Sequence, residues 1–188
     1  MEALLNIDRE LLLLLNPLGS PAFDSFWIIV SGTAVWIPLY VVFLYLLKKN
    51  NSWRNMAFIL LFIALGVTTS DQLANVFKYG IERLRPCHEP SLEGLIREVK
   101  CGGSFGFYSA HASNTFFLGT FLTLLLGKTY RLLPWALFLW AGTVAYSRIY
   151  LGVHYPLDVL YGASVGFLLG GFYGALTRKV LSKRVAAV

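Results

Sequence analysis

The feature that most constrains this fold is a series of five apolar segments, each near the roughly 20 residues that cross the hydrocarbon core of a bilayer. Charged residues make up 14% of the 188 residues, against roughly 25% in a soluble domain. The sequence therefore predicts an all-α integral membrane protein, a bundle of about five transmembrane helices in a single domain over residues 1–188. The segments cover residues 25–47, 56–77, 109–126, 132–149 and 155–181.

Residues 1–16 are apolar but too short to span a bilayer. They carry Asp8, Arg9 and Glu10 within one helical turn, and Asn16 and Pro17 then interrupt the pattern. We predict an interfacial helix that lies on the membrane, with a short sixth span as the alternative. The segment also lacks the basic start of a signal peptide.

Positive charge predicts the orientation of the chain. Three segments, after the first span, after the third and at the C-terminus, contain Lys and Arg but no Asp or Glu, and such connections stay in the cytoplasm. The C-terminus is then cytoplasmic and the loop 79–108 extracytoplasmic. Since these cations account for the net charge of +6, nucleic-acid binding is not indicated. They are Lys48, Lys49, Arg54, Lys128, Arg131, Arg178, Lys179, Lys183 and Arg184.

Both cysteines, Cys87 and Cys101, lie in the predicted extracytoplasmic loop. Outside the cytoplasm they are candidates for a disulfide, and free thiols are the alternative. A zinc site with His88 would lack one ligand and a recognised spacing, so no metal site is predicted.

Residues 147–158 contain the most constrained chemistry. Pro156 fits the first position of a helix, which places Asp158 in the first turn, one turn from His154. A carboxylate that accepts the proton of one imidazole nitrogen leaves the other nitrogen free as a nucleophile. Arg148, in the same short segment, can bind phosphate oxygens with two hydrogen bonds.

Residues 108–111 lie where the third span begins. The free N–H groups of a helix start bind anions, so the Ser109 hydroxyl and the Ala110 N–H are candidate phosphate donors. Ser109 is equally suited to cap the helix. His111, in the first turn, can protonate a departing oxygen.

Residues 78–86 add cations at the outer end of the second span. We assign Lys78 and Arg85 to phosphate binding, because a phosphoryl group needs several fixed cations. For Arg83 we favour snorkelling toward lipid headgroups. Asp71 and Asn75 precede Lys78 on about the same helical face, and we expect them to support the site rather than react.

These three strings resemble the PAP2 superfamily, the type 2 phosphatidic acid phosphatases, whose pattern is K-x6-R-P, P-S-G-H and S-R-x5-H-x3-D. Lys78, Arg85 and Pro86 meet the first part, and Ser147, Arg148, His154 and Asp158 meet the third. The second part departs twice, with Tyr108 in place of proline and Ala110 in place of glycine.

The resemblance implies a helical core shared with vanadate-dependent haloperoxidases, catalysis without a metal or cofactor, and inhibition by vanadate. His154 would form a phosphohistidine, Asp158 would orient it, and His111 would protonate the leaving oxygen. Lys78, Arg85, Ser109, Ala110 and Arg148 would hold the phosphoryl oxygens.

The implied activity is a lipid phosphate or diphosphate phosphatase at the outer leaflet of a bacterial inner membrane. Undecaprenyl diphosphate is the favoured substrate, and lipid A and phosphatidylglycerophosphate are the alternatives. A lipid phosphotransferase would use the same histidine intermediate, whereas a lipid transporter would have no use for a complete catalytic set.

Overall fold

The computed structural model describes residues 2–185, and side chains as far as Lys183, so Arg184 of the predicted cytoplasmic tail lies outside the described side chains. Within this range the chain is helical and forms no strand. The long helices are α1 (Glu2–Leu15), α2 (Pro21–Ser31), α3 (Ile37–Lys49), α4 (Trp53–Ile81), α5 (Ala110–Leu126), α6 (Leu133–Tyr150) and α7 (Pro156–Val185). Short 3-10 turns cover Asn16–Leu18, Ala34–Trp36, Pro86–His88 and Pro90–Leu92.

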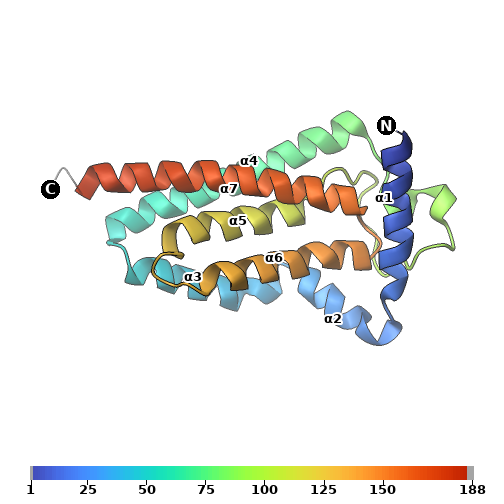
Figure 1. The fold of residues 1–188 in the computed structure, drawn as a ribbon, viewed down its shortest axis with the longest axis horizontal. Coiled ribbons are helices and arrows are strands. Elements are labelled where there is room, and N and C mark those ends of the chain that lie inside the picture. Colours follow the sequence, from blue (N-terminus) through green and yellow to red (C-terminus); the bar gives the residue numbers. More distant parts are fainter. Residues whose placement is uncertain (1, 186–188) are drawn as a thin grey trace.

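Helices α3 to α7 run along one axis, with α1 lying across one end of the bundle (Figure 1). By length and apolarity alone, α4 and α7 qualify as membrane spans within the described residues, and α1 with α2 would add a third if counted as one bent span. The segment Glu2–Leu18 makes an angle of 113° with α2, so α1 turns away from the bundle. This arrangement agrees with the predicted interfacial helix.

The first predicted span is broken in two. Helix α2 ends at Ser31, and α3 begins at Ile37 after Gly32, Thr33 and a 3-10 turn. The other four spans match α4 to α7 to within a few residues at most ends. Hydropathy identified this stretch as apolar, but the glycine and the turn that follow α2 divide it.

Helix α5 occupies the centre of the bundle and packs against α4, α6 and α7. Its closest neighbour is α7, which presents Gly162 and Gly166 one turn apart. A Cβ atom at Gly166 would lie 2.3 Å from the carbonyl oxygen of Ser113, and one at Gly162 would lie 2.4 Å from that of Ser109. Small residues at this spacing let two membrane helices approach closely. They therefore set how far the start of α5 lies from the start of α7.

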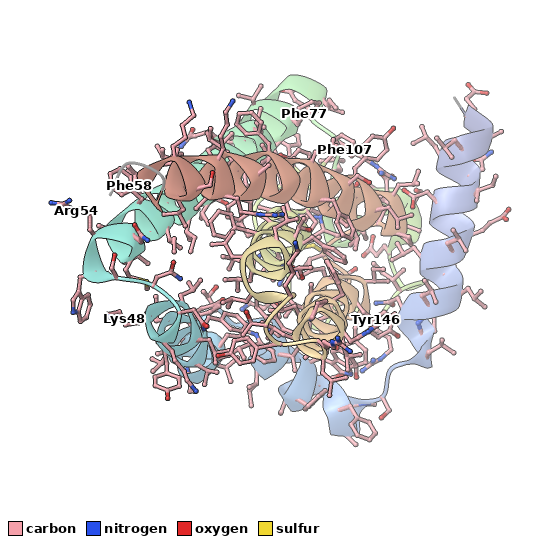
Figure 2. The ribbon with its side chains drawn as sticks, turned by 60° about the vertical axis from the view of Figure 1, so that its left-hand side comes forward. Lys48, Arg54, Phe58, Phe77, Phe107 and Tyr146 are labelled. Atoms are coloured by element: carbon pink, nitrogen blue, oxygen red, sulfur yellow. A yellow bond between two sulfur atoms is a disulfide. The ribbon has the colours of Figure 1, made fainter. Side chains whose placement is uncertain are left out.

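The two ends of the bundle differ in chemistry. The start of α5, the start of α7 and the loop after α4 meet at the end covered by α1 (Figure 1). Lys48 and Arg54 lie at the other end (Figure 2). All three motifs are therefore together at one end, separated from these cations by the length of the spans.

Candidate active site

His154 and Asp158 are placed by the tight turn between α6 and α7. The N–H groups of Val153 and His154 both donate to the carbonyl oxygen of Arg148, at 3.1 and 3.3 Å, which fixes the turn. His154 Nδ1 lies 3.4 Å from Asp158 Oδ2 without forming a hydrogen bond to any described residue, and both side chains are buried. The same Oδ2 accepts a hydrogen bond of 3.0 Å from the N–H of Tyr155. This geometry suits a carboxylate that holds one imidazole nitrogen.

The protonation state of His154 follows from its surroundings. Burial lowers the pKa of His154 to about 4, and Asp158 opposes that shift while Arg148 and Arg85 reinforce it. The imidazole is therefore neutral near pH 7, which is the state a nucleophile requires.

Three cations of the motifs have no acid partner among the described residues. Within residues 2–183, no ion pair of 4.0 Å or less involves Lys78, Arg85 or Arg148. Arg148 donates to the Ser31 hydroxyl, and Arg85 donates to the carbonyl oxygens of Phe105 and Val153 at 3.2 and 3.4 Å. Burial is the main cause that lowers the pKa of Arg85. Partly buried cations without carboxylates are suited to bind an anion.

A cavity of about 280 Å³ joins Lys78 to Arg85. Asn75 lines this cavity, but its side chain is otherwise exposed. Asp71 faces a different cavity and accepts a 2.8 Å hydrogen bond from Asn114 Nδ2. Asp71 and Asn75, both predicted to support the site, therefore line two different cavities.

The start of α5 carries the second motif. The Ser109 hydroxyl caps the helix by accepting from the N–H of Ala112 at 3.4 Å, and the Ser109 N–H donates to the carbonyl oxygen of Asp158 at 3.0 Å. This bond ties the start of α5 to the start of α7. Ala110 opens the helix without the positive φ that would favour glycine. His111 is half-buried and lines the Asp71 cavity.

Tyr108, which replaces the proline of the family pattern, is buried. Its hydroxyl donates to the carbonyl oxygen of Ser70 at 3.3 Å, and its ring packs against Phe77 with centroids 5.6 Å apart. The departure therefore fills a gap between α4 and the start of α5.

Arg83 is where the sequence-based expectation is wrong. It does not extend toward headgroups but bridges two carboxylates that are fully buried, with Nη1 2.8 Å from Asp158 Oδ1 and Nη2 2.6 Å from Asp8 Oδ2. Its guanidinium lies 3.9 Å from the centre of the Tyr155 ring. Asp8 also accepts from the N–H of Leu157 at 2.8 Å. Helix α1 thus holds Asp158 through Arg83.

Sequence reasoning missed this link because it treated Asp8 as one charge of an amphipathic helix. Asp8 lies among leucines, and an acid in apolar surroundings requires a partner. That signal was available, but nothing local in the sequence identifies Arg83, 75 residues away, as the partner.

The loop between α4 and α5 is fastened to the bundle. Cys87 and Cys101 form a disulfide, so their sulfurs are not available as thiolate ligands beside His88. Asn16 donates to the carbonyl oxygens of Arg97, Ile149 and Tyr150 and accepts from the N–H of Arg97. Arg97 pairs with Asp24 of α2 at 2.7 Å.

Comparisons with known proteins agree with the motifs. The pattern of the PAP2 superfamily matches residues 56–181. A lipid A 4'-phosphatase of Bacteroides thetaiotaomicron is 40% identical over 99% of this chain and 82% of its own length. A lipid A 4'-phosphatase of Porphyromonas gingivalis is 32% identical over 92% of this chain and 73% of its own.

One solved structure, a transmembrane PAP2 type phosphatidylglycerolphosphate phosphatase of Bacillus subtilis, has the same fold. It superposes with a TM-score of 0.73 at 24% identity and covers 96% of this chain and 89% of its own. The motifs, the helical bundle and these relatives agree. The chain therefore belongs to the PAP2 superfamily, among its membrane-bound lipid phosphatases.

Proposed function

We propose that this protein removes a phosphate monoester from lipid A at the outer leaflet of a bacterial inner membrane, through a phosphohistidine on His154. The observation that carries the proposal is a buried histidine–aspartate pair beside Arg85 and Arg148, two cations that make no ion pair with any described residue. Lys78 lines a cavity with Arg85. Such a site binds a phosphate dianion and can attack it.

Lipid A replaces undecaprenyl diphosphate, the substrate that the resemblance favoured. Undecaprenyl diphosphate has no support among the relatives described above, whereas two of them, at 40% and 32% identity, are lipid A 4'-phosphatases. Lipid A was an alternative on the sequence alone, and it is now the leading one. The fold match to a phosphatidylglycerolphosphate phosphatase keeps that lipid as a comparison substrate.

In the first step, Lys78, Arg85 and Arg148 hold the phosphoryl oxygens, and the free imidazole nitrogen of His154 attacks phosphorus. The bond from phosphorus to the lipid oxygen breaks, and His111 gives that oxygen a proton. Asp158 stabilises the positive charge that develops on His154. The phosphate donors at the start of α5 are the Ser109 hydroxyl and the Ala110 N–H.

In the second step, His111 removes a proton from water, and the water oxygen attacks the phosphohistidine. The bond from phosphorus to nitrogen breaks, inorganic phosphate leaves, and His154 is neutral again. Every proton moves between groups of the chain, the substrate and water, so no metal ion or cofactor has a step.

The orientation of the chain in the membrane is part of the same proposal. The positive-inside rule puts the end of the bundle with Lys48 and Arg54 in the cytoplasm. The site at the opposite end then faces the periplasm, and the C-terminus is cytoplasmic.

The test is phosphate release by the purified full-length protein in the presence of EDTA. The panel holds lipid A, phosphatidylglycerophosphate, phosphatidic acid and undecaprenyl diphosphate, each run beside His154→Ala. We expect fastest release from lipid A and none from the variant. Faster release from another lipid would overturn the substrate, and release by His154→Ala would overturn the mechanism. Transfer of phosphate to an added lipid acceptor in preference to water would instead identify a phosphotransferase.

A further inference from the structure

A cavity of about 500 Å³ opens beside His111, between the break that follows α2 and the facing sides of α4 and α5. We propose that this cavity receives the leaving group, and that Asp71 and Asn114 in it recognise a hydroxyl or amide N–H carried near the ester oxygen. The inference rests on the proposed function and specifies which lipid alcohols the site accepts.

The place of the cavity follows from the direction of the reaction. In phosphoryl transfer the attacking and leaving atoms lie roughly in line, on opposite sides of phosphorus. His154 attacks and His111 protonates the leaving oxygen, so the lipid alcohol lies on the His111 side. The His111 side chain lines this cavity, with Asp71 and Asn114 beside it.

Polar atoms inside the cavity are incompletely paired. Asn114 Nδ2 donates to Asp71 Oδ1 at 2.8 Å, but Asn114 Oδ1 is buried and makes no hydrogen bond to any described residue. A buried acceptor without a donor is unfavourable, and native structures supply a partner. A hydroxyl or amide N–H of the substrate would be that partner, and a carboxylate nearby strengthens binding of any donor.

The rest of the lining is mostly apolar. Trp36, Tyr40, Val67 and Leu118 surround the polar pair, as expected of a pocket that holds a hydrocarbon chain and orients it by a few polar groups. Asp71 precedes Lys78 by two helical turns, about 10 Å along the axis. A donor on a sugar ring or on its first acyl linkage lies within that reach of the phosphate.

The inference divides lipid phosphates into two classes. An acylated aminosugar carries hydroxyl and amide groups close to the phosphate ester and can pair with Asn114. A phosphate on a long-chain alcohol such as dodecanol carries no donor beside the ester. Asp71 and Asn114 therefore favour hydrolysis of the aminosugar phosphate and contribute nothing to hydrolysis of the long-chain alcohol phosphate.

The experiment measures kcat/KM of the full-length protein on lipid A and on dodecyl phosphate, for Asn114→Ala and for Asp71→Asn. We expect each variant to lose about tenfold on lipid A, as for a lost hydrogen bond to a buried partner, and to stay within about twofold on dodecyl phosphate. The control is Thr143→Ala, because the Thr143 hydroxyl of α6 donates to its own helix at Leu139 and does not line the cavity.

Equal losses on both substrates would show that the pair only joins α4 to α5, and they would overturn the inference. Unchanged rates on both would overturn it as well. If the unmodified protein hydrolyses dodecyl phosphate but not lipid A, the proposed substrate fails. The proposed function stands, and the inference alone fails, if lipid A is hydrolysed and the variants lose no selectivity. A melting curve for Asp71→Asn, which keeps the size of the side chain, separates misfolding from lost selectivity.

Discussion

Replacing Arg83 by Gln tests whether the contact of α1 with Asp158 matters for catalysis. Arg83 lies between Asp8 and Asp158, both fully buried, at 2.6 and 2.8 Å. Removing one partner from a buried ion pair costs about 3–5 kcal/mol, because a charge stays buried without compensation. Here two carboxylates lose their shared cation, so we expect a clear drop in melting temperature.

The effect on catalysis is separate from the effect on stability. Without Arg83, Asp158 keeps the Tyr155 N–H but loses the group that fixes its other oxygen. A misplacement of about 1 Å in a catalytic group costs about 100-fold in rate, or about 2.7 kcal/mol. We therefore expect kcat of the folded Arg83→Gln protein to fall by about 100-fold.

The assay is phosphate release by folded protein, measured beside a matched Arg–Asp pair. Arg97→Gln breaks a pair of similar length, 2.7 Å, whose side chains are 23% and 26% exposed, so the loss of stability is much smaller than for Arg83→Gln. Asp8→Asn combined with Arg83→Gln should add little to Arg83→Gln, because Asp8 acts through Arg83. The reasoning is refuted if folded Arg83→Gln keeps the kcat of Arg97→Gln. It is also refuted if the losses in kcat of Asp8→Asn and Arg83→Gln add in the double variant.

Three further predictions concern the histidine, the inhibitor and the helix contact. Because the pKa of His154 is lowered to about 4, from an unperturbed value near 6.5, the folded protein binds this proton less readily than the unfolded chain. Its contribution of about 3 kcal/mol is present above pH 6.5 and lost as the pH falls toward 4, so a melting series should show a loss that His154→Gln lacks. With EDTA present, vanadate should inhibit phosphate release and compete with the lipid phosphate. Inhibition that does not compete with the lipid would argue against a phosphate site at Arg148. Gly166→Val should lower the melting temperature more than Gly171→Val, since a Cβ at Gly166 would overlap α5 and one at Gly171 meets no atom within 4 Å.

The sequence predicted the parts that depend on local pattern. Apolar length locates spans, and the spacing of His154 and Asp158 places both on one face of a helix start. For the spans and for this pair, the relevant residues lie within one segment, so periodicity is sufficient. The cations at the span ends lie on different segments, and the predicted topology placed them together at one end of the bundle.

The rest depends on contacts between distant segments. Asp8 reaches Arg83 across 75 residues, and Asn16 reaches Ile149 across 133. Asp71 and Asn75 share a helix and were expected to act together, but the neighbouring helix and loop decide which cavity each one lines. Tertiary packing fixes these partners, and no local propensity encodes it.

The most direct test of the central claim is to capture the phosphohistidine. Lipid A labelled in its 4'-phosphate is mixed with the full-length protein, the reaction is stopped in alkali, and the labelled peptide is identified by mass spectrometry. We predict label on the peptide that contains His154, and none in His154→Ala. Label on another residue, or turnover by His154→Ala, would contradict the account.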